Sequence, residues 1–225
     1  MIQDAYSVSN KIVRVGDNKM NSISQFASMQ IKPEIVTALE QEGIVTPTNI
    51  QEKAIPLIKE GKDVIGMSRT GSGKTASFGI PLLEKVVPKQ GVQGLILAPT
   101  RELANQISNE LRKWGKNLDI RIATVFGGVA LDPQTDKIAV SEIVVGTPGR
   151  ILDHLERGNL ELNGLNCFVL DEADKMVEMG FIEPIEYILK ATPDNRQIVL
   201  FGATLSTELD YLKNKYMSEV AVAES

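Results

Sequence analysis

The sequence has few residues of the types that build disulfide scaffolds and zinc sites. It contains one cysteine, Cys167, and one histidine, His154. A single cysteine cannot form an internal disulfide, and Cys167 lies in the apolar stretch NCFVL, which is typical of a small core residue. His154 has no partner at a metal-ligand spacing. We therefore expect no zinc site, and we expect His154 to be at the surface or half-buried.

The sequence also lacks long apolar runs and a surplus of positive charge. No run approaches the roughly 18 apolar residues of a membrane span, so we expect no membrane partner. Residues 1–20 show neither a signal-peptide nor a transit-peptide pattern, which favours an intracellular, cytoplasmic protein. The formal net charge is -5. This argues against coating of nucleic acid by bulk charge, so any such binding must rely on a few placed groups.

Six short apolar runs alternate with amphipathic stretches over most of the chain. The apolar runs are residues 63–67, 94–99, 121–126, 142–147, 166–171 and 197–203. The amphipathic stretches include residues 75–87, 101–115, 149–158 and 181–191. This alternation predicts an α/β fold with a mostly parallel sheet and helices on both faces. We expect one domain over residues 23–225, preceded by an unassigned N-terminal extension of residues 1–22.

The first apolar run is followed by the glycine-rich stretch SRTGSGKT, which opens a helix. The residues expected to surround bound phosphates are Ser68, Thr70, Gly71, Ser72, Gly73, Lys74 and Thr75. The glycines let backbone N–H groups point at phosphate oxygens, Lys74 reaches the terminal phosphates, and the Thr75 hydroxyl can ligate Mg²⁺. The strict pattern has glycine in place of Ser68. The strand, loop and helix context nevertheless predicts a P-loop.

The P-loop alone does not identify the nucleotide or the reaction. Guanine is disfavoured because none of the three Asn-Lys pairs, at residues 10, 18 and 214, continues into the guanine-reading NKxD pattern. A small-molecule kinase is consistent with the P-loop but leaves the acidic cluster at residues 171–174 without a role.

That acidic cluster ends a buried strand in the sequence FVLDEADK. Asp171 is placed to hold Mg²⁺ beside the P-loop threonine. Glu172 is placed to orient and deprotonate the water that attacks the γ-phosphate. Asp174 could take part in the chemistry of this cluster. The alternative is that it only caps the start of the next helix, where negative charge is favourable.

Together these stretches resemble the N-terminal RecA-like domain of the DEAD-box RNA helicases, whose namesake motif is DEAD. Residues 43–51, GIVTPTNIQ, are similar to the family's adenine-reading Q motif. Phe26 lies at the family's spacing for an aromatic residue that stacks on adenine. The resemblance implies a RecA-like fold with ATP and Mg²⁺ as cofactors, Gln51 at the adenine edge and Phe26 on the ring.

Three further stretches, PTREL, the Gly127–Gly128 pair and TPGR, are similar to the family's RNA-contacting motifs. The implied contacts to phosphates and riboses come from Thr100, Arg101, Gly128, Thr147 and Arg150. Such contacts would make RNA binding independent of base sequence. The basic residues of 110–121 are expected to form a solvated helix face, with an additional RNA patch as the alternative.

The chain departs from the family in two respects. The family uses a second RecA-like domain to complete the RNA groove, and this chain contains only one, so we expect a fragment with little activity alone. The family's Ser-Ala-Thr motif is GAT here, which removes the hydroxyl expected to bond Asp174. We therefore expect Asp174 to bond Thr204 or water, with Asp174, Gly202 and Thr204 as interdomain coupling residues.

The sequence thus predicts the ATP-binding domain of an ATP-dependent RNA helicase. Two alternatives remain open. One is a nucleotide-responsive interaction module without productive catalysis, and the other is a P-loop ATPase that acts on DNA.

Overall fold

A seven-stranded parallel sheet forms the centre of the molecule in the computed structural model, which describes residues 24–225. The strand order is β3-β4-β2-β5-β6-β1-β7. The strands are β1 (Val64–Met67), β2 (Gly94–Leu97), β3 (Ile122–Val125), β4 (Ile143–Gly146), β5 (Cys167–Leu170), β6 (Gln197–Gly202) and β7 (Ala221–Glu224). The predicted parallel α/β fold is therefore confirmed. The extension predicted for residues 1–22 lies outside the described residues.

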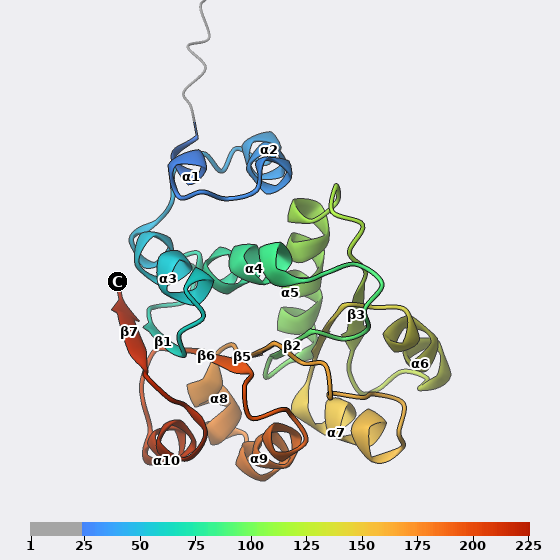
Figure 1. Cartoon of the computed structure of the whole chain (residues 1–225). Coiled ribbons are helices and arrows are strands. Elements are labelled where there is room, and N and C mark those ends of the chain that lie inside the picture. The colour runs from blue at the N-terminus through green and yellow to red at the C-terminus, as the bar shows by residue number, and fades with distance from the viewer. Residues whose placement is uncertain (1–23) are drawn as a thin grey trace, which may run out of the picture.

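Helices cover both faces of the sheet (Figure 1). On one side lie α1 (Gln25–Ser28), α2 (Pro33–Gln41), α3 (Asn49–Lys59), α4 (Lys74–Lys85) and α5 (Arg101–Trp114). On the other side lie α7 (Pro148–Glu156), α8 (Ala173–Glu178), α9 (Ile182–Lys190) and α10 (Thr207–Tyr216), and α6 (Asp132–Ala139) packs beside β3. No helix among these described residues is both long and apolar enough to cross a membrane.

All six expected strands are present, and each begins and ends within two residues of its predicted position. The strand β7 was not expected from the sequence, and it pairs only with β1 at the edge of the sheet. Of its four residues only Ala223 is buried, and Val222 is 56% exposed. A four-residue edge strand lacks the continuous apolar run that marks a strand buried on both faces.

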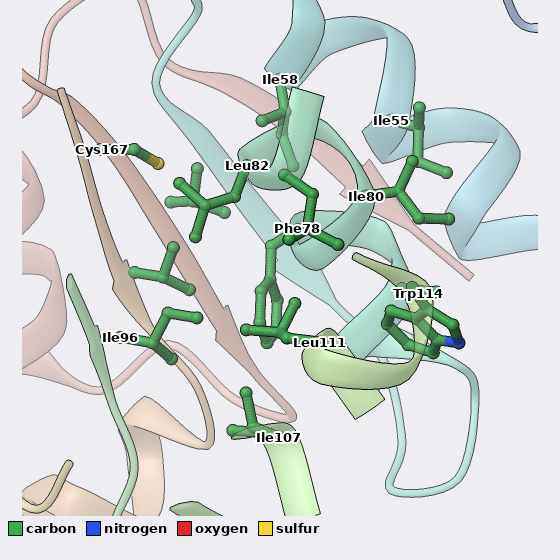
Figure 2. Close-up of a cluster of buried hydrophobic side chains, with 14 of the residues drawn as sticks. Ile55, Ile58, Phe78, Ile80, Leu82, Ile96, Ile107, Leu111, Trp114 and Cys167 are labelled. Atoms are coloured by element: carbon green, nitrogen blue, oxygen red, sulfur yellow. The ribbon is translucent and has the colours of Figure 1, made fainter. Parts of the chain in front are cut away.

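Two apolar layers hold the helices to the sheet. Figure 2 shows part of one layer, where Phe78 of α4 lies among Ile96 of β2 and Leu111 of α5. Cys167 is buried in the same layer, and burial raises the pKa of its thiol to about 12. The expectation of a core cysteine is confirmed.

The packing of the Phe201 ring of β6 against β1 depends on Gly66. A Cβ atom at this position would lie 2.1 Å from the nearest ring atom of Phe201, whose ring is fully buried in β6. Immediately after these paired residues, the N–H of Ser68 donates to the carbonyl of Gly202. Gly66 thus leaves room for the Phe201 ring between the two strands that carry the P-loop and the GAT sequence.

We expect Gly66→Ala to destabilise the fold by about 1–3 kcal/mol, because the added methyl group overpacks a core without free space. Urea unfolding followed by circular dichroism measures the change. Gly164→Ala is the matched control, because its Cβ would make only an ordinary contact of 3.7 Å with the Val92 carbonyl. Equal free energies of unfolding for the two variants would contradict the packing argument.

Candidate functional site

The sequence motifs divide into two groups along the carboxyl edge of the sheet. The neighbouring strands β5, β6 and β1 end in the DEAD sequence, the GAT sequence and the P-loop. The neighbouring strands β3, β4 and β2 end in the glycine pair, TPGR and PTREL. Ligands of open parallel sheets bind at this edge. The topology therefore places the expected nucleotide residues in one half of the edge and the expected RNA residues in the other.

The P-loop has the backbone that a phosphate cradle needs. Gly71 and Gly73 have φ angles of +82° and +89°, which L side chains rarely adopt. Gly73 is the N-cap of α4, and the hydroxyl oxygens of Ser68 and Ser72 lie 2.6 Å apart across the loop. Lys74, the first residue of α4, is buried. A glycine turn leading into a helix N-terminus offers N–H groups and positive potential to an anion.

The N-cap and first turn of α3 hold the P-loop by hydrogen bonds. The Gln51 side chain accepts from the Thr48 N–H (2.9 Å) and donates to the Gly73 carbonyl (3.0 Å). The Thr48 hydroxyl donates to the Ser72 carbonyl (2.8 Å). A Cβ at Gly73 would lie 2.4 Å from Gln51 Nε2, so glycine is required there for space as well as for φ. The loop is thus held by side chains before any ligand binds.

A cavity of about 320 Å³ brings the P-loop and the acidic pair together. Its lining includes Gln51, Thr70, Gly71, Gly73, Lys74, Thr75, Asp171 and Glu172. Leu103, Gln106, Glu110 and Trp114 of α5 also line the cavity, and none of them was expected at the site from the sequence. The sequence shows that these four residues share one face of the helix, but it does not show which loop this face contacts.

Asp171 is a carboxylate buried at the end of β5, with 2% of its surface exposed. Burial raises its pKa to about 6, and the nearby Lys74 acts in the opposite direction. Within residues 24–225, no cationic side chain lies within 4.0 Å of Asp171, and its Oδ1 accepts only from the Glu172 N–H (2.9 Å). A buried carboxylate without an ion-pair partner is costly unless a cation neutralises it.

The oxygens of Asp171 and Thr75 are the ligand type that Mg²⁺ prefers, and both residues line the same cavity. The residues present therefore fit a magnesium ion together with a phosphate group.

Glu172 has an unusual backbone at the position expected for the catalytic base. Its φ and ψ are both 49°, in the left-handed region, and it is the N-cap of α8. Its carboxylate is half-buried and lies 3.8 Å from the Lys175 ammonium. Such a conformation costs of order 1–3 kcal/mol for a residue with a side chain. With this backbone, Glu172 lines the cavity together with Asp171.

Asp174 is bonded to the GAT sequence. Its Oδ2 accepts from the N–H groups of Ala203 (2.9 Å) and Thr204 (3.1 Å) and lies 3.4 Å from the Thr204 hydroxyl. A Cβ at Gly202 would lie 3.3 Å from Asp174 Oδ1. The bond to Thr204 expected from the sequence is present, and two backbone donors strengthen it.

The side chains expected to read adenine are not free in this conformation. Phe26 is fully buried in the apolar layer with Ile31 and Ile35 and does not line the cavity. Both polar atoms of the Gln51 amide have partners inside the protein. The adenine contacts of these two residues stay predictions.

The other half of the edge gathers the expected RNA residues. Thr100 caps α5 by accepting from the Leu103 N–H (3.2 Å), and the exposed Arg101 guanidinium lies 5.3 Å from the centre of the Phe126 ring. Gly128 is exposed with φ of +82°. Thr147 follows β4, where its N–H donates to the Val125 carbonyl.

Arg150 is less accessible than expected for a side chain that contacts RNA. Its side chain is 15% exposed, and its Nη1 donates to the Val129 carbonyl (3.1 Å) and to Gln134 Oε1 (3.3 Å). In this structure Arg150 therefore holds the loop that follows β3, and its contact with RNA stays a prediction.

The expectation for His154 needs correction. His154 is fully buried, neither at the surface nor half-buried, because α6 and the turn after α7 cover it and supply Gln134 and Asn159 as partners. The cations of the 110–121 face are exposed as expected, but Arg112 bonds the Ile122 carbonyl (2.9 Å) and Lys113 pairs with Glu42 (2.9 Å). Because these bonds engage two of the cations, they argue against the alternative that this face is an additional RNA-binding patch.

The chain is similar to known helicases over most of its length. A sequence model described as DEAD/DEAH box helicase matches residues 48–212. A probable ATP-dependent RNA helicase of Methanocaldococcus jannaschii is 45% identical over 195 residues, which cover 86% of this chain and 53% of that protein.

Two solved structures share the fold. A DEAD box protein from the hyperthermophile Methanococcus jannaschii has a TM-score of 0.86 and 44% identity, covering 88% of this chain and 55% of that one. A hypothetical ATP-dependent RNA helicase from Sulfolobus tokodaii has a TM-score of 0.79 and 38% identity, covering 85% and 56%. The chain spans about half the length of these relatives. On this sequence match and this shared fold, the chain belongs to the DEAD/DEAH box helicase family.

Proposed function

We propose that this chain is the ATP-binding domain of an RNA helicase. It binds ATP with Mg²⁺ at the P-loop and the sugar-phosphate backbone of RNA at the ends of β3, β4 and β2. Joined to a second RecA-like domain, it couples ATP hydrolysis to the separation of RNA strands. The observation that supports this most strongly is the single cavity lined by Lys74, Asp171 and Glu172.

Each residue of that cavity has a separate task in the proposal. The P-loop N–H groups and Lys74 bind the phosphates, which keeps the terminal phosphate in a fixed position. Thr75 and Asp171 would hold Mg²⁺, which supplies positive charge to the phosphate oxygens. Glu172 accepts a hydrogen bond from water and orients it for attack on the γ-phosphate.

Adenine recognition is proposed to involve Gln51, because an amide can both donate to and accept from the adenine edge. In the ligand-free structure this amide bonds the Thr48 N–H and the Gly73 carbonyl. Binding of the base would exchange these bonds for bonds to adenine. Base recognition would then be linked to the position of the P-loop, to which Gln51 is tied.

RNA binding is proposed to be independent of sequence. The contacts would come from exposed backbone at Gly128, the α5 N-terminus at Thr100 and the exposed Arg101. Groups of these types contact phosphates and riboses rather than base edges. With a net charge of -5, binding through so few placed groups would be weak in this chain alone.

The proposal predicts that Lys74→Ala weakens Mg·ATP binding by roughly 10- to 100-fold, because a charge-assisted bond to phosphate is lost. Glu172→Gln should keep ATP binding and abolish hydrolysis in a protein that contains both RecA-like domains. Fluorescence anisotropy with a labelled ATP analogue measures binding, and phosphate release measures hydrolysis.

Lys62→Ala, an exposed lysine at the opposite end of β1, is the matched control for binding. Equal affinity of the Lys74→Ala and Lys62→Ala variants would count against the site. Stronger stimulation of ATP hydrolysis by DNA than by RNA of equal length would favour the DNA-directed alternative. Absent stimulation by either polymer would favour an interaction module.

If Asp171 is buried to hold a cation, its charge should destabilise the ligand-free fold. The folded pKa of about 6 lies above the usual value near 4. The protonated Asp171 carboxyl group therefore stabilises the fold at low pH, and this stabilisation is lost as the pH rises through about 6. We expect Asp171→Asn to stabilise the metal-free chain by about 1–3 kcal/mol at pH 7.5 and by much less at pH 4.

Urea unfolding at the two pH values measures this difference, with the exposed Asp194→Asn as control. A gain in stability that is the same at pH 4 and pH 7.5 would show that burial of the charge is not its cause.

The GAT sequence predicts altered coupling. Gly202→Ser would place a Cβ 3.3 Å from Asp174 Oδ1, where its hydroxyl can join the Ala203 and Thr204 donors on that carboxylate. In a protein with both RecA-like domains, we expect more RNA unwound per ATP hydrolysed. Parallel unwinding and phosphate-release assays give this ratio, and Gly202→Ala separates the effect of the hydroxyl from that of the methylene. An unchanged ratio in the serine variant would remove Gly202 from the coupling.

A further inference from the structure

His154 is buried behind the loop that follows β3, and its ring nitrogens have two defined partners. Nε2 lies 3.2 Å from Gln134 Oε1, and Nδ1 lies 3.4 Å from Asn159 Nδ2. The Gln134 amide is oriented by its own Nε2, which donates to the Phe126 carbonyl (2.9 Å). The Oε1 atom of Gln134 therefore faces His154 and accepts a hydrogen bond from its Nε2. One neutral form of the imidazole ring can make both hydrogen bonds. In this form Nε2 carries the proton and donates to Gln134, and Nδ1 accepts from Asn159.

Gln134 connects His154 to the expected RNA-binding residues. Its Oε1 also accepts from Arg150 Nη1 (3.3 Å), and the same Nη1 donates to the Val129 carbonyl (3.1 Å). The Arg150–Val129 bond is exposed, whereas Gln134 is only 5% exposed and its bonds to His154 and Arg150 are buried or partly buried. Bonds in such a place are stronger, and loss of one partner leaves another polar group unpaired.

The loop of residues 126–129 is consequently held at both ends. Gln134 fixes the carbonyl of Phe126, and Arg150 fixes the carbonyl of Val129. Gly127 and Gly128 lie exposed between these two anchors, and no contact within 4 Å would oppose a Cβ at either glycine. Because no neighbouring atoms pack against the Cβ positions of the two glycines, the position of their backbone depends on the bonds that Gln134 and Arg150 make to Phe126 and Val129.

We propose that His154 and Gln134 are positioning residues for RNA binding: neutral His154 donates to Gln134, which holds Arg150 and residues 126–129 in the RNA-binding conformation. This inference rests on the proposed function for its RNA readout, whereas the hold on the loop can be measured without RNA. Neither residue needs to touch RNA.

Protonation of His154 would weaken this arrangement. A second cation would then share Gln134 Oε1 with the Arg150 guanidinium, and the two charges would repel each other. Burial lowers the pKa of His154, the Arg150 and Arg157 guanidinium groups lower it further, and Asp153 opposes them. Arg150 and Asp153 lie on α7, and Arg157 is its C-cap.

The elements next to α7 carry charged residues of their own. Those of α6, which is hydrogen-bonded to α7, are Asp132, Asp136 and Lys137, and those of α9, which packs on α7, are Glu183, Glu186 and Lys190. None of them contributes to the shift of the His154 pKa. His154 is therefore neutral at pH 7 and becomes charged only below its usual range near pH 6.5.

The test compares RNA affinity between pH 5 and pH 8 for the 225-residue chain and two variants. His154→Gln keeps an amide N–H donor for Gln134 but cannot titrate, and His154→Leu keeps the volume without a donor. Anisotropy of a labelled single-stranded RNA of mixed sequence, at low salt, gives the dissociation constant.

We expect the unsubstituted chain to lose RNA affinity by about tenfold on acidification, the glutamine variant to show no such loss, and the leucine variant to be about tenfold weaker at every pH. Affinity for the ATP analogue should be unchanged at pH 7.5 in both variants, because the nucleotide cavity lies on other strands. Thermal unfolding confirms that each variant is folded.

NMR of the RNA-free chain tests the hold on the loop directly. The backbone amide signals of Gly127 and Gly128 should move with the His154 titration and should not move in the glutamine variant. Signals that ignore this titration, or a leucine variant with unchanged RNA affinity, would overturn the positioning role. If the glycine signals follow His154 but the chain binds no RNA at any pH, the positioning stands and the proposed function fails.

Discussion

The parallel pairing of β6 with β5 on one side and β1 on the other is the interaction on which the candidate site depends. Because the three strands run in the same direction, the DEAD sequence, the GAT sequence and the P-loop leave the sheet next to one another. Every residue of β6 is buried, so a shift of this strand would expose apolar side chains of both layers. The sheet thereby fixes the relative positions of groups that lie about a hundred residues apart in the sequence.

The two halves of the edge are organised by different means. In the half that contains the P-loop, Thr48 and Gln51 at the start of α3 hold the P-loop by hydrogen bonds to its carbonyl groups. In the other half, a buried histidine, a glutamine and an arginine hold an exposed glycine loop. The halves meet where the Asp171 N–H donates to the carbonyl of Leu97 in the neighbouring strand. Hydrogen bonds within the protein thus hold the loops of both halves in position.

Much of this arrangement could be predicted from the sequence, because strands buried on both faces are apolar runs and their carboxyl ends share one edge. That logic placed Lys74 near Asp171 correctly. It could not find the α5 wall at Gln106 and Glu110, since a helix sequence does not show which loop its polar face meets. It misplaced His154 for a related reason: the cover comes from α6, whose Gln134 is distant in sequence. The Thr48–Gln51 capping box, by contrast, was readable as T-x-x-Q.

The left-handed backbone of Glu172 has a consequence for how this chain would respond to artificial selection. A glycine at position 172 would relax the strained φ, and asparagine tolerates that region better than glutamate. A library screened only for resistance to heat would thus be drawn toward replacing this carboxylate, which the proposed function assigns to the attacking water. Under that proposal, a stabilised library would retain glutamate only if the screen also reports turnover.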